Sequence, residues 1–320
     1  GSIGSHILKS LLATGKHEVT VLTRPESTAT FPSSTNIIKV DYTSAPSITS
    51  ALQGQDFLVI TLAVSSPPDL HSRIVNAAAE ANVKYIMPNY YGYGLSERSG
   101  SAPADPILGS FGRFVNDVRS VQEKGWKGKY VALCCGFWYE FSLGMGEAWL
   151  GFDLHNRKVT FYDQGEKKVN VSTWELCGKA VAALLSLPID KADNDSPALS
   201  DWDNSGVYVS SFLTNQREIL ASLHRVLGTT DADWTINQQP VEERYEQGLK
   251  ELQGGDRTGY AKAMYAKIFY PEGRGDYETG WGVDNGKLGL EEESLNVATK
   301  RTLEMVDGGF GYRKYLPKEQ

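Results

Sequence analysis

Strand-forming and helix-forming segments alternate along the first half of this 320-residue chain. The segments rich in β-branched and other apolar residues lie at 17–24, 36–42, 56–63, 84–88 and 129–135. Amphipathic segments between them predict helices. The run "DFLVITLA" at 56–63 is apolar at six of its eight residues, as strands of a buried parallel sheet tend to be. Repeated strand–helix–strand units predict a doubly wound parallel sheet with helices on both faces, the Rossmann type of α/β fold.

The pattern becomes less regular after about residue 136. Helices are expected near 214–227, 240–253 and 257–269, and Gly and aromatic residues dominate 269–290. We therefore expect a sheet domain over residues 1–150 and a smaller mixed α/β lobe over 151–320. Some segments of this lobe are expected to return to the first sheet.

Composition and charge argue against several classes of partner. The formal net charge of −7 disfavours nonspecific binding to nucleic acid, which requires clustered Lys and Arg. The sequence contains neither a run of 18 apolar residues nor a secretory signal, so a cytoplasmic protein without a membrane partner is expected. Cys134 and Cys135 lie in an apolar strand, which predicts buried, unreactive thiols, and no His and Cys group has metal-site spacing.

The first four residues directly precede an amphipathic helix. Unpaired N–H groups at a helix N-terminus form an anion site, and glycine lets a diphosphate approach the main chain closely. The backbone predicted to bind the diphosphate of a dinucleotide is that of Gly1, Ser2, Ile3 and Gly4. Two glycines alone would also suit an ordinary turn.

Arg24 ends the strand at 17–24 and follows Gly4 by 20 residues. In dinucleotide-binding folds the residue at this distance contacts the adenosine ribose. An acidic residue would bind the ribose hydroxyls of NAD, whereas a guanidinium fits the 2′-phosphate of NADP. NADPH is thus the expected cofactor. Glu26 nearby leaves NAD possible, and a solvent-facing Arg24 is the alternative.

Several segments together resemble the NmrA-like proteins among the atypical short-chain dehydrogenases, especially fungal members related to isoflavone reductase and phenylcoumaran benzylic ether reductase. They are "GSIGSHIL", "VLTRP", "ALQGQDFLVITLA", "VKYIMPNYYGYG", "VALCCGFWYEFSLG", "STWELCGKAVAALLSLP" and "LTNQREILASLHRVLG". The resemblance covers almost the whole chain. It implies a Rossmann fold, NAD(P) binding and a place in fungal secondary metabolism.

Members of this family open with a strand and a Gly-x-x-Gly-x-x-Gly turn. Gly1 and Gly4 match the second and third of these glycines. The resemblance therefore implies that a first glycine and a first strand precede the residues given. Such a strand would lie inside the sheet, where its neighbours need it as a hydrogen-bonding partner.

The resemblance also places residues along the cofactor. The residues that align with a Pro-Ser-Glu-Phe segment beneath the nicotinamide are Pro88, Asn89, Tyr90 and Tyr91. The residues whose backbone is expected to pass the adenosine and the diphosphate are Thr61, Leu62 and Ala63.

One position departs from the family's reductases, which carry a Lys four residues before an Arg on the following helix. Arg119 matches the Arg, but Val115 stands where the Lys belongs. The Tyr-x-x-x-Lys pair of ordinary short-chain dehydrogenases is not evident either. The identity of a proton donor therefore stays open.

Aromatic residues follow two predicted strands, at the edge where doubly wound sheets bind ligands. A phenol can protonate the atom left negative after hydride arrives, so Tyr91 is the first candidate for this role and Tyr139 the second. The residues expected to line an apolar substrate pocket are Tyr93, Phe137, Trp138, Tyr260 and Met264. Packing within the core is the alternative for each of them.

Two functions remain open at this point. The first is an NADPH-dependent reductase of an aromatic or phenolic small molecule, favoured by the aromatic segments at 90–93 and 137–141. The second is a non-catalytic NAD(P)-binding sensor, favoured by Val115 at the lysine position. Either is expected to act as a monomer or a homodimer.

Overall fold

A parallel sheet forms the centre of the first half of the chain. The computed structural model describes residues 1–93, 107–191, 196–271 and 275–311. The strands of this sheet are β3 (Phe57–Val59), β4 (Tyr85–Met87), β6 (Lys129–Cys134) and β11 (Ser205–Tyr208), with the short β5 (Tyr91–Gly92) also paired to β6. Their order is β11-β6-β4-β3 and every pairing is parallel. β11 comes from the second half of the chain and extends the sheet beyond β6.

A second, two-stranded parallel sheet is formed by β1 (Thr20–Thr23) and β2 (Asn36–Lys39). Within the described residues, β1 pairs only with β2 and β3 pairs only with β4. In that part of the chain the two sheets are joined by side-chain packing, in which Leu22 and Val40 contribute to the same apolar cluster as Ile60.

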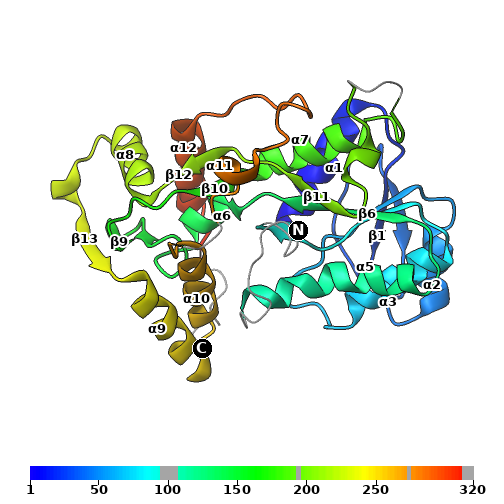
Figure 1. Ribbon diagram of the computed structural model, residues 1–320, viewed down its shortest axis with the longest axis horizontal. Helices are drawn as coiled ribbons and strands as arrows, with labels where there is room; N and C mark the ends of the chain where they lie inside the picture. The colour runs from blue at the N-terminus through cyan, green and yellow to red at the C-terminus, as the bar shows by residue number, and fades with distance from the viewer. Residues whose placement is uncertain (94–106, 192–195, 272–274, 312–320) are drawn as a thin grey trace.

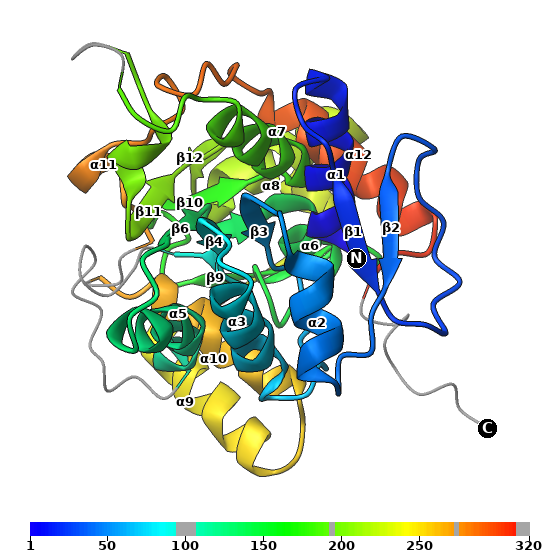
Figure 2. The ribbon, with the colours of Figure 1, turned by 90° about the vertical axis from the view of Figure 1, so that its right-hand side faces the viewer.

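Helices cover both faces of the sheet (Figures 1 and 2). One face carries α1 (Ser2–Thr14) and α7 (Trp174–Leu185), and the other carries α2 (Ala45–Leu52), α3 (Leu70–Glu80) and α5 (Arg113–Glu123). The side chains of β6 alternate between the two cores. Tyr130, Ala132 and Cys134 pack on the α3 and α5 side, whereas Val131 and Leu133 pack on the α1 and α7 side. The doubly wound fold predicted from the strand–helix alternation is thereby confirmed.

Two helices end or begin at residues that commonly cap helices. Gly15 ends α1 in the left-handed conformation with φ 64, as a C-cap glycine does. Thr173 caps α7, its hydroxyl accepting a hydrogen bond from the N–H of Leu176 at 2.9 Å. All three cysteines are free and buried, as expected for packing thiols.

From residue 137 onward the chain forms two further three-stranded sheets, β12-β10-β7 and β13-β9-β8. The strands are β7 (Phe137–Trp138), β8 (Phe152–Asp153), β9 (Lys158–Tyr162), β10 (Val169–Ser172), β12 (Phe212–Thr214) and β13 (Thr235–Gln239). The helices are α6 (Tyr139–Gly144), α8 (Gln216–Leu227), α9 (Val241–Gln253), α10 (Thr258–Ile268), α11 (Glu278–Trp281) and α12 (Leu295–Asp307). Short 3₁₀ helices lie at Leu108–Gly112, Leu199–Trp202 and Asp231–Asp233. α9 and α10 pack against each other at one end of the molecule (Figure 1).

Across the described ranges, the structure has no helix with the length and apolar character that a membrane crossing requires.

α1 and α7 approach each other so closely that a side chain has no room at their crossing. A Cβ on Gly178 would lie 2.5 Å from the carbonyl oxygen of His6. We expect Gly178→Ala to lower the free energy of unfolding by about 1–3 kcal/mol, because the helices must move apart to admit the methyl group. Urea unfolding followed by circular dichroism measures this change.

The matched control is Gly280→Ala, because a Cβ at Gly280 meets no atom within 4 Å. Equal unfolding free energies for Gly178→Ala and the wild type would show that the crossing is not tightly packed.

Candidate functional site

The first turn of α1 lies against the chain that leaves β3. A Cβ on Gly4 would lie 2.8 Å from Oγ1 of Thr61, so glycine permits this approach. Gly1 and Ser2 are exposed beside it, and the N–H groups of a first helical turn have no acceptor within the helix. Ligands of doubly wound sheets bind outside the carboxyl ends of the strands. The turn therefore has the backbone, exposure and position of a diphosphate cradle.

Asn89 joins the loops that follow β3 and β4. Its Oδ1 accepts a hydrogen bond from the N–H of Leu62 at 2.9 Å, and its Nδ2 donates to the carbonyl oxygen of Leu62 at 3.4 Å. Tyr91 adds a second connection, because its hydroxyl donates to the carbonyl oxygen of Ile60 at 2.9 Å. Two segments that the sequence predicted to lie along one cofactor are thus in contact. Pro88 is buried beside them, and Ala63 is exposed at the edge.

Arg24 lies on the loop after β1 with a mostly exposed side chain, and its Nε is 3.4 Å from Oε1 of Glu26. Sequence reasoning missed a second cation here, Lys39, which ends β2 opposite Thr23 in the parallel register. The Nζ of Lys39 donates to the carbonyl oxygen of Ser27 at 2.8 Å. The loop after β1 therefore has two positive charges close to it, and only the strand pairing reveals the second.

The three tyrosines that follow β4 all donate their hydroxyl protons to backbone carbonyl groups. Tyr90 donates to Tyr93, Tyr91 to Ile60, and Tyr93 to Asn170. Burial raises the pKa of each of these phenols above its ordinary value. All three are neutral at physiological pH, and each hydroxyl is already engaged in this arrangement.

Tyr139, the other proposed proton donor, is fully buried at the start of α6. Its hydroxyl lies 2.6 Å from Oγ1 of Thr299. Burial is the main cause of the raised pKa of this phenol. Its role as a proton donor stays a prediction.

Aromatic rings from β7, from α10 and from Tyr93 after β4 meet in one cluster. The ring of Phe137 stacks on Tyr265 with centroids 3.7 Å apart, and Tyr93 meets Phe137 edge-on at 4.8 Å. Met264, half-buried, packs on the same cluster. Sequence reasoning missed Tyr265, which lies one residue beyond the helical face chosen from the spacing of Tyr260 and Met264.

The remaining proposed substrate residues lie elsewhere. Trp138 packs in the cluster beneath α1 and α7, 6.2 Å from the ring of Trp174. Tyr260 is half-buried on α10. Val115, at the position of the family's lysine, is 3% exposed and packs in the apolar core under α5. A valine there contributes packing and cannot move a proton.

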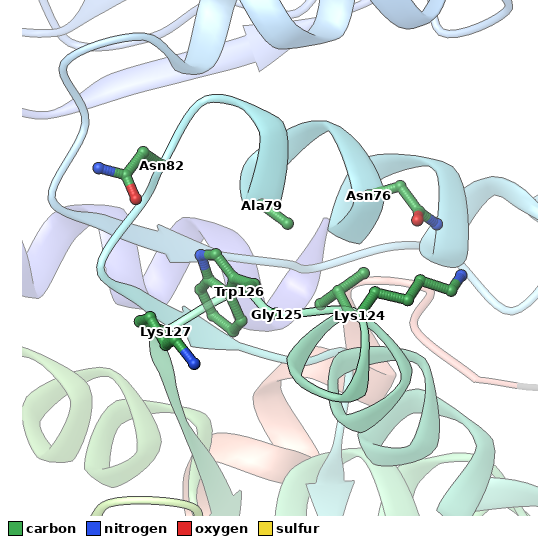
Figure 3. A pocket seen from close by; sticks show the side chains of 8 residues that line it. Asn76, Ala79, Asn82, Lys124, Gly125, Trp126 and Lys127 are labelled. Carbon is green, nitrogen blue, oxygen red and sulfur yellow. The ribbon is translucent and has the colours of Figure 1, made fainter.

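A surface hollow between α3 and α5 lies at the opposite edge of the sheet (Figure 3). It is lined by Asn82 and Trp126, which belong to the turns before β4 and β6, and by Lys124 and Lys127. The indole N–H of Trp126 donates to the carbonyl oxygen of Val83 at 3.0 Å. The hollow thus opens at the amino ends of the strands, away from the first turn of α1.

Comparisons with known proteins agree with this geometry. Residues 1–113 match the family described as NAD(P)H-binding. The first third of the chain is an NAD(P)H-binding domain. This match confirms the expected dinucleotide cofactor, and the matched residues include Gly4, Arg24 and Asn89.

Similarity extends beyond this NAD(P)H-binding domain to nearly the whole chain. The oxidoreductase poxI of Penicillium oxalicum is 26% identical over 320 residues, covering 95% of this chain and 92% of that protein. A crystal structure of isoflavone reductase superposes with a TM-score of 0.71 at 18% identity, covering 95% of this chain and 96% of that one. The structure of AtPrR2 with NADP+ and (+)pinoresinol gives a TM-score of 0.72 at 18% identity, covering 94% and 96%. The resemblance to the isoflavone reductase group is therefore confirmed for the fold.

The contact between Gly4 and Thr61 can be tested by filling it. We expect Gly4→Ala to weaken NADPH binding about tenfold, because the added methyl pushes the first turn of α1 away from the loop after β3. Titration of NADPH fluorescence with protein measures the affinity.

The double variant Gly4→Ala with Thr61→Ala should recover most of the affinity, because the threonine hydroxyl and methyl that meet the new Cβ are gone. Thr61→Ala alone serves as the control. Unchanged affinity in Gly4→Ala would contradict the cradle.

Proposed function

We propose that the protein is an NADPH-dependent reductase that transfers a hydride to an aromatic or phenolic small molecule. The observation that carries this proposal is the first turn of α1, held by the contact of Gly4 with Thr61 at the carboxyl edge of the parallel sheet. The structural similarity to AtPrR2, which was solved with NADP+ and (+)pinoresinol, supports a substrate of this class.

Three parts of the chain would hold the cofactor. The amides of residues 1–4 would bind the diphosphate. The guanidinium of Arg24 would pair with the 2′-phosphate, with Lys39 adding positive charge to the same loop. The loop from Pro88 to Tyr91 would lie at the nicotinamide end. When bound there, NADPH supplies the hydride.

The substrate side is proposed to be the aromatic cluster of Tyr93, Phe137 and Tyr265. Its rings offer apolar faces and edges against which a planar aromatic ring packs in offset or edge-on geometry. With an aromatic ring bound against them, these apolar side chains would also exclude water from the reacting carbon. Trp138, Tyr260 and Met264 stay proposed as substrate contacts.

Proton supply places a condition on this reaction. Tyr91 is the residue we propose for it, and its raised pKa keeps the phenol protonated at neutral pH. Its hydroxyl is bonded to the carbonyl oxygen of Ile60, so the proton becomes available only when substrate displaces this bond. Tyr139 is the second proposal, with its hydroxyl bonded to Thr299.

The alternative function is a non-catalytic sensor that binds NAD(P) and changes partners. The burial of Val115 in the core favours it, because the helix that carries the family's lysine has no proton-transferring group at this position. The engagement of all three phenols after β4 with backbone carbonyls favours it as well.

Cofactor preference is tested by reversing the charge at residue 24. We expect Arg24→Glu to weaken NADPH binding at least about tenfold and to leave NADH binding within about threefold of the wild type, because the carboxylate repels the 2′-phosphate. Fluorescence titration with each cofactor measures both affinities. Arg157→Glu on the far lobe is the charge-matched control. Retained NADPH preference would remove Arg24 from the site.

Catalysis is tested by following NADPH absorbance over phenolic ketones, enones and benzylic ethers. We expect turnover of at least one of these classes. We also expect Tyr91→Phe to lower kcat about 100-fold with little change in KM, because only the proton is lost. Tight NADPH binding with no turnover of any class would favour the sensor.

A further inference from the structure

His71 is buried at the start of α3, with both ring nitrogens hydrogen bonded. Its Nδ1 lies 2.7 Å from Oδ2 of Asp117 on α5, and its Nε2 lies 3.2 Å from the backbone nitrogen of Asn89. The ring is 2% exposed and meets the ring of Phe114 edge-on, with centroids 4.7 Å apart. One side chain thus links α3, α5 and the loop after β4.

The partners determine where the imidazole carries its hydrogen. The backbone N–H of Asn89 can only donate, so Nε2 must present a lone pair. The hydrogen therefore sits on Nδ1 and is donated to the carboxylate of Asp117. Burial lowers the pKa of His71, Arg113 acts in the same direction, and Asp117 opposes both. The neutral ring matches the hydrogen bonds that it makes.

Asn89 passes this constraint to the loop after β3. Its backbone is fixed by His71, while its side-chain amide pairs with both the N–H and the carbonyl oxygen of Leu62. Leu62 follows Thr61, which contacts the first turn of α1 at Gly4. A continuous line of contacts therefore runs from Asp117 on α5 to the first turn of α1, the proposed diphosphate cradle.

Imidazole suits this place for a geometric reason. Its donor and its acceptor lie on opposite sides of one rigid ring, whereas an amide side chain presents both on a single fork. A glutamine can carry an acceptor as far as Nε2, and an asparagine can reach only as far as Nδ1. The two substitutions therefore separate the bond to Asn89 from the bond to Asp117.

We propose that His71 is a positioning residue. Through its bond to the backbone of Asn89, it holds the segment after β4 in the position that cofactor binding requires. This proposal rests on the proposed function, because the loop is the one assigned to the nicotinamide end. His71 is not itself proposed to contact the cofactor or the substrate. It acts through the backbone of Asn89.

The test compares NADPH affinity in His71→Asn and His71→Gln of the full chain. His71→Asn keeps a donor toward Asp117 but loses the bond to Asn89, and we expect the Kd for NADPH to rise about tenfold. His71→Gln keeps an acceptor for the Asn89 N–H and should stay within about threefold of the wild type. His17→Asn is the matched control, because His17 bonds Ser186 before β1, at the other edge of the sheet.

Thermal unfolding separates positioning from stability. We expect similar unfolding midpoints for the asparagine and glutamine variants, with different affinities. We also expect faster hydrogen exchange at the Leu62 amide in His71→Asn only. Equal affinity for His71→Asn and the wild type would overturn the proposal, as would equal losses in both variants that follow their midpoints.

Asp117→Ala is the second variant if His71→Asn does not fold, because it removes the carboxylate that orients the imidazole ring while leaving Asn89 unchanged, and the Asp117 side chain is 28% exposed. Wild-type NADPH affinity in Asp117→Ala would overturn the proposal. Absence of NADPH binding by the wild type would overturn the proposed function together with this inference. Binding by the wild type without an effect of His71→Asn would overturn the inference alone.

Discussion

The contact between the first turn of α1 and the chain leaving β3 is the constraint on which the site depends. Doubly wound sheets bind ligands at their carboxyl edge, and α1 presents its unpaired amides there because its first turn lies against this edge. A side chain at residue 4 would meet Thr61 and hold the turn away. The sheet then determines where the other loops of the site lie. Parallel strands bring their following loops together, so the loops that carry Arg24, Leu62 and Asn89 share one side of the molecule.

The first sheet is buried on both faces, and the second half of the chain supplies part of the covering layer. The side chains of β6 alternate between two apolar cores, and each core requires its own layer of helices. One layer comes from α2, α3 and α5. The other includes α7, which follows β10, while β11 extends the sheet itself. The cofactor edge and the aromatic cluster are therefore parts of one packed arrangement.

The sequence predicted the alternation of strands and helices well, because the spacing of apolar residues and the content of β-branched residues depend directly on local structure. The family resemblance placed the segments at Leu62 and Asn89 along one cofactor, and the structure shows that they are in contact. The sequence did not reveal His71, Lys39 or Tyr265. Each of these depends on which residues the fold brings together, and an isolated His, Lys or Tyr carries no such signal. The role of Val115 was visible only as a departure from the family pattern.

The stacked pair of Phe137 and Tyr265 joins two regions of different origin. Phe137 follows β6 of the first sheet, whereas Tyr265 belongs to α10, whose main helical neighbour is α9. Under the proposed function, changes along these two helices reshape the surface that meets the reacting molecule and leave the dinucleotide end untouched. Descendants of such a protein can therefore diverge in substrate while keeping the same hydride donor.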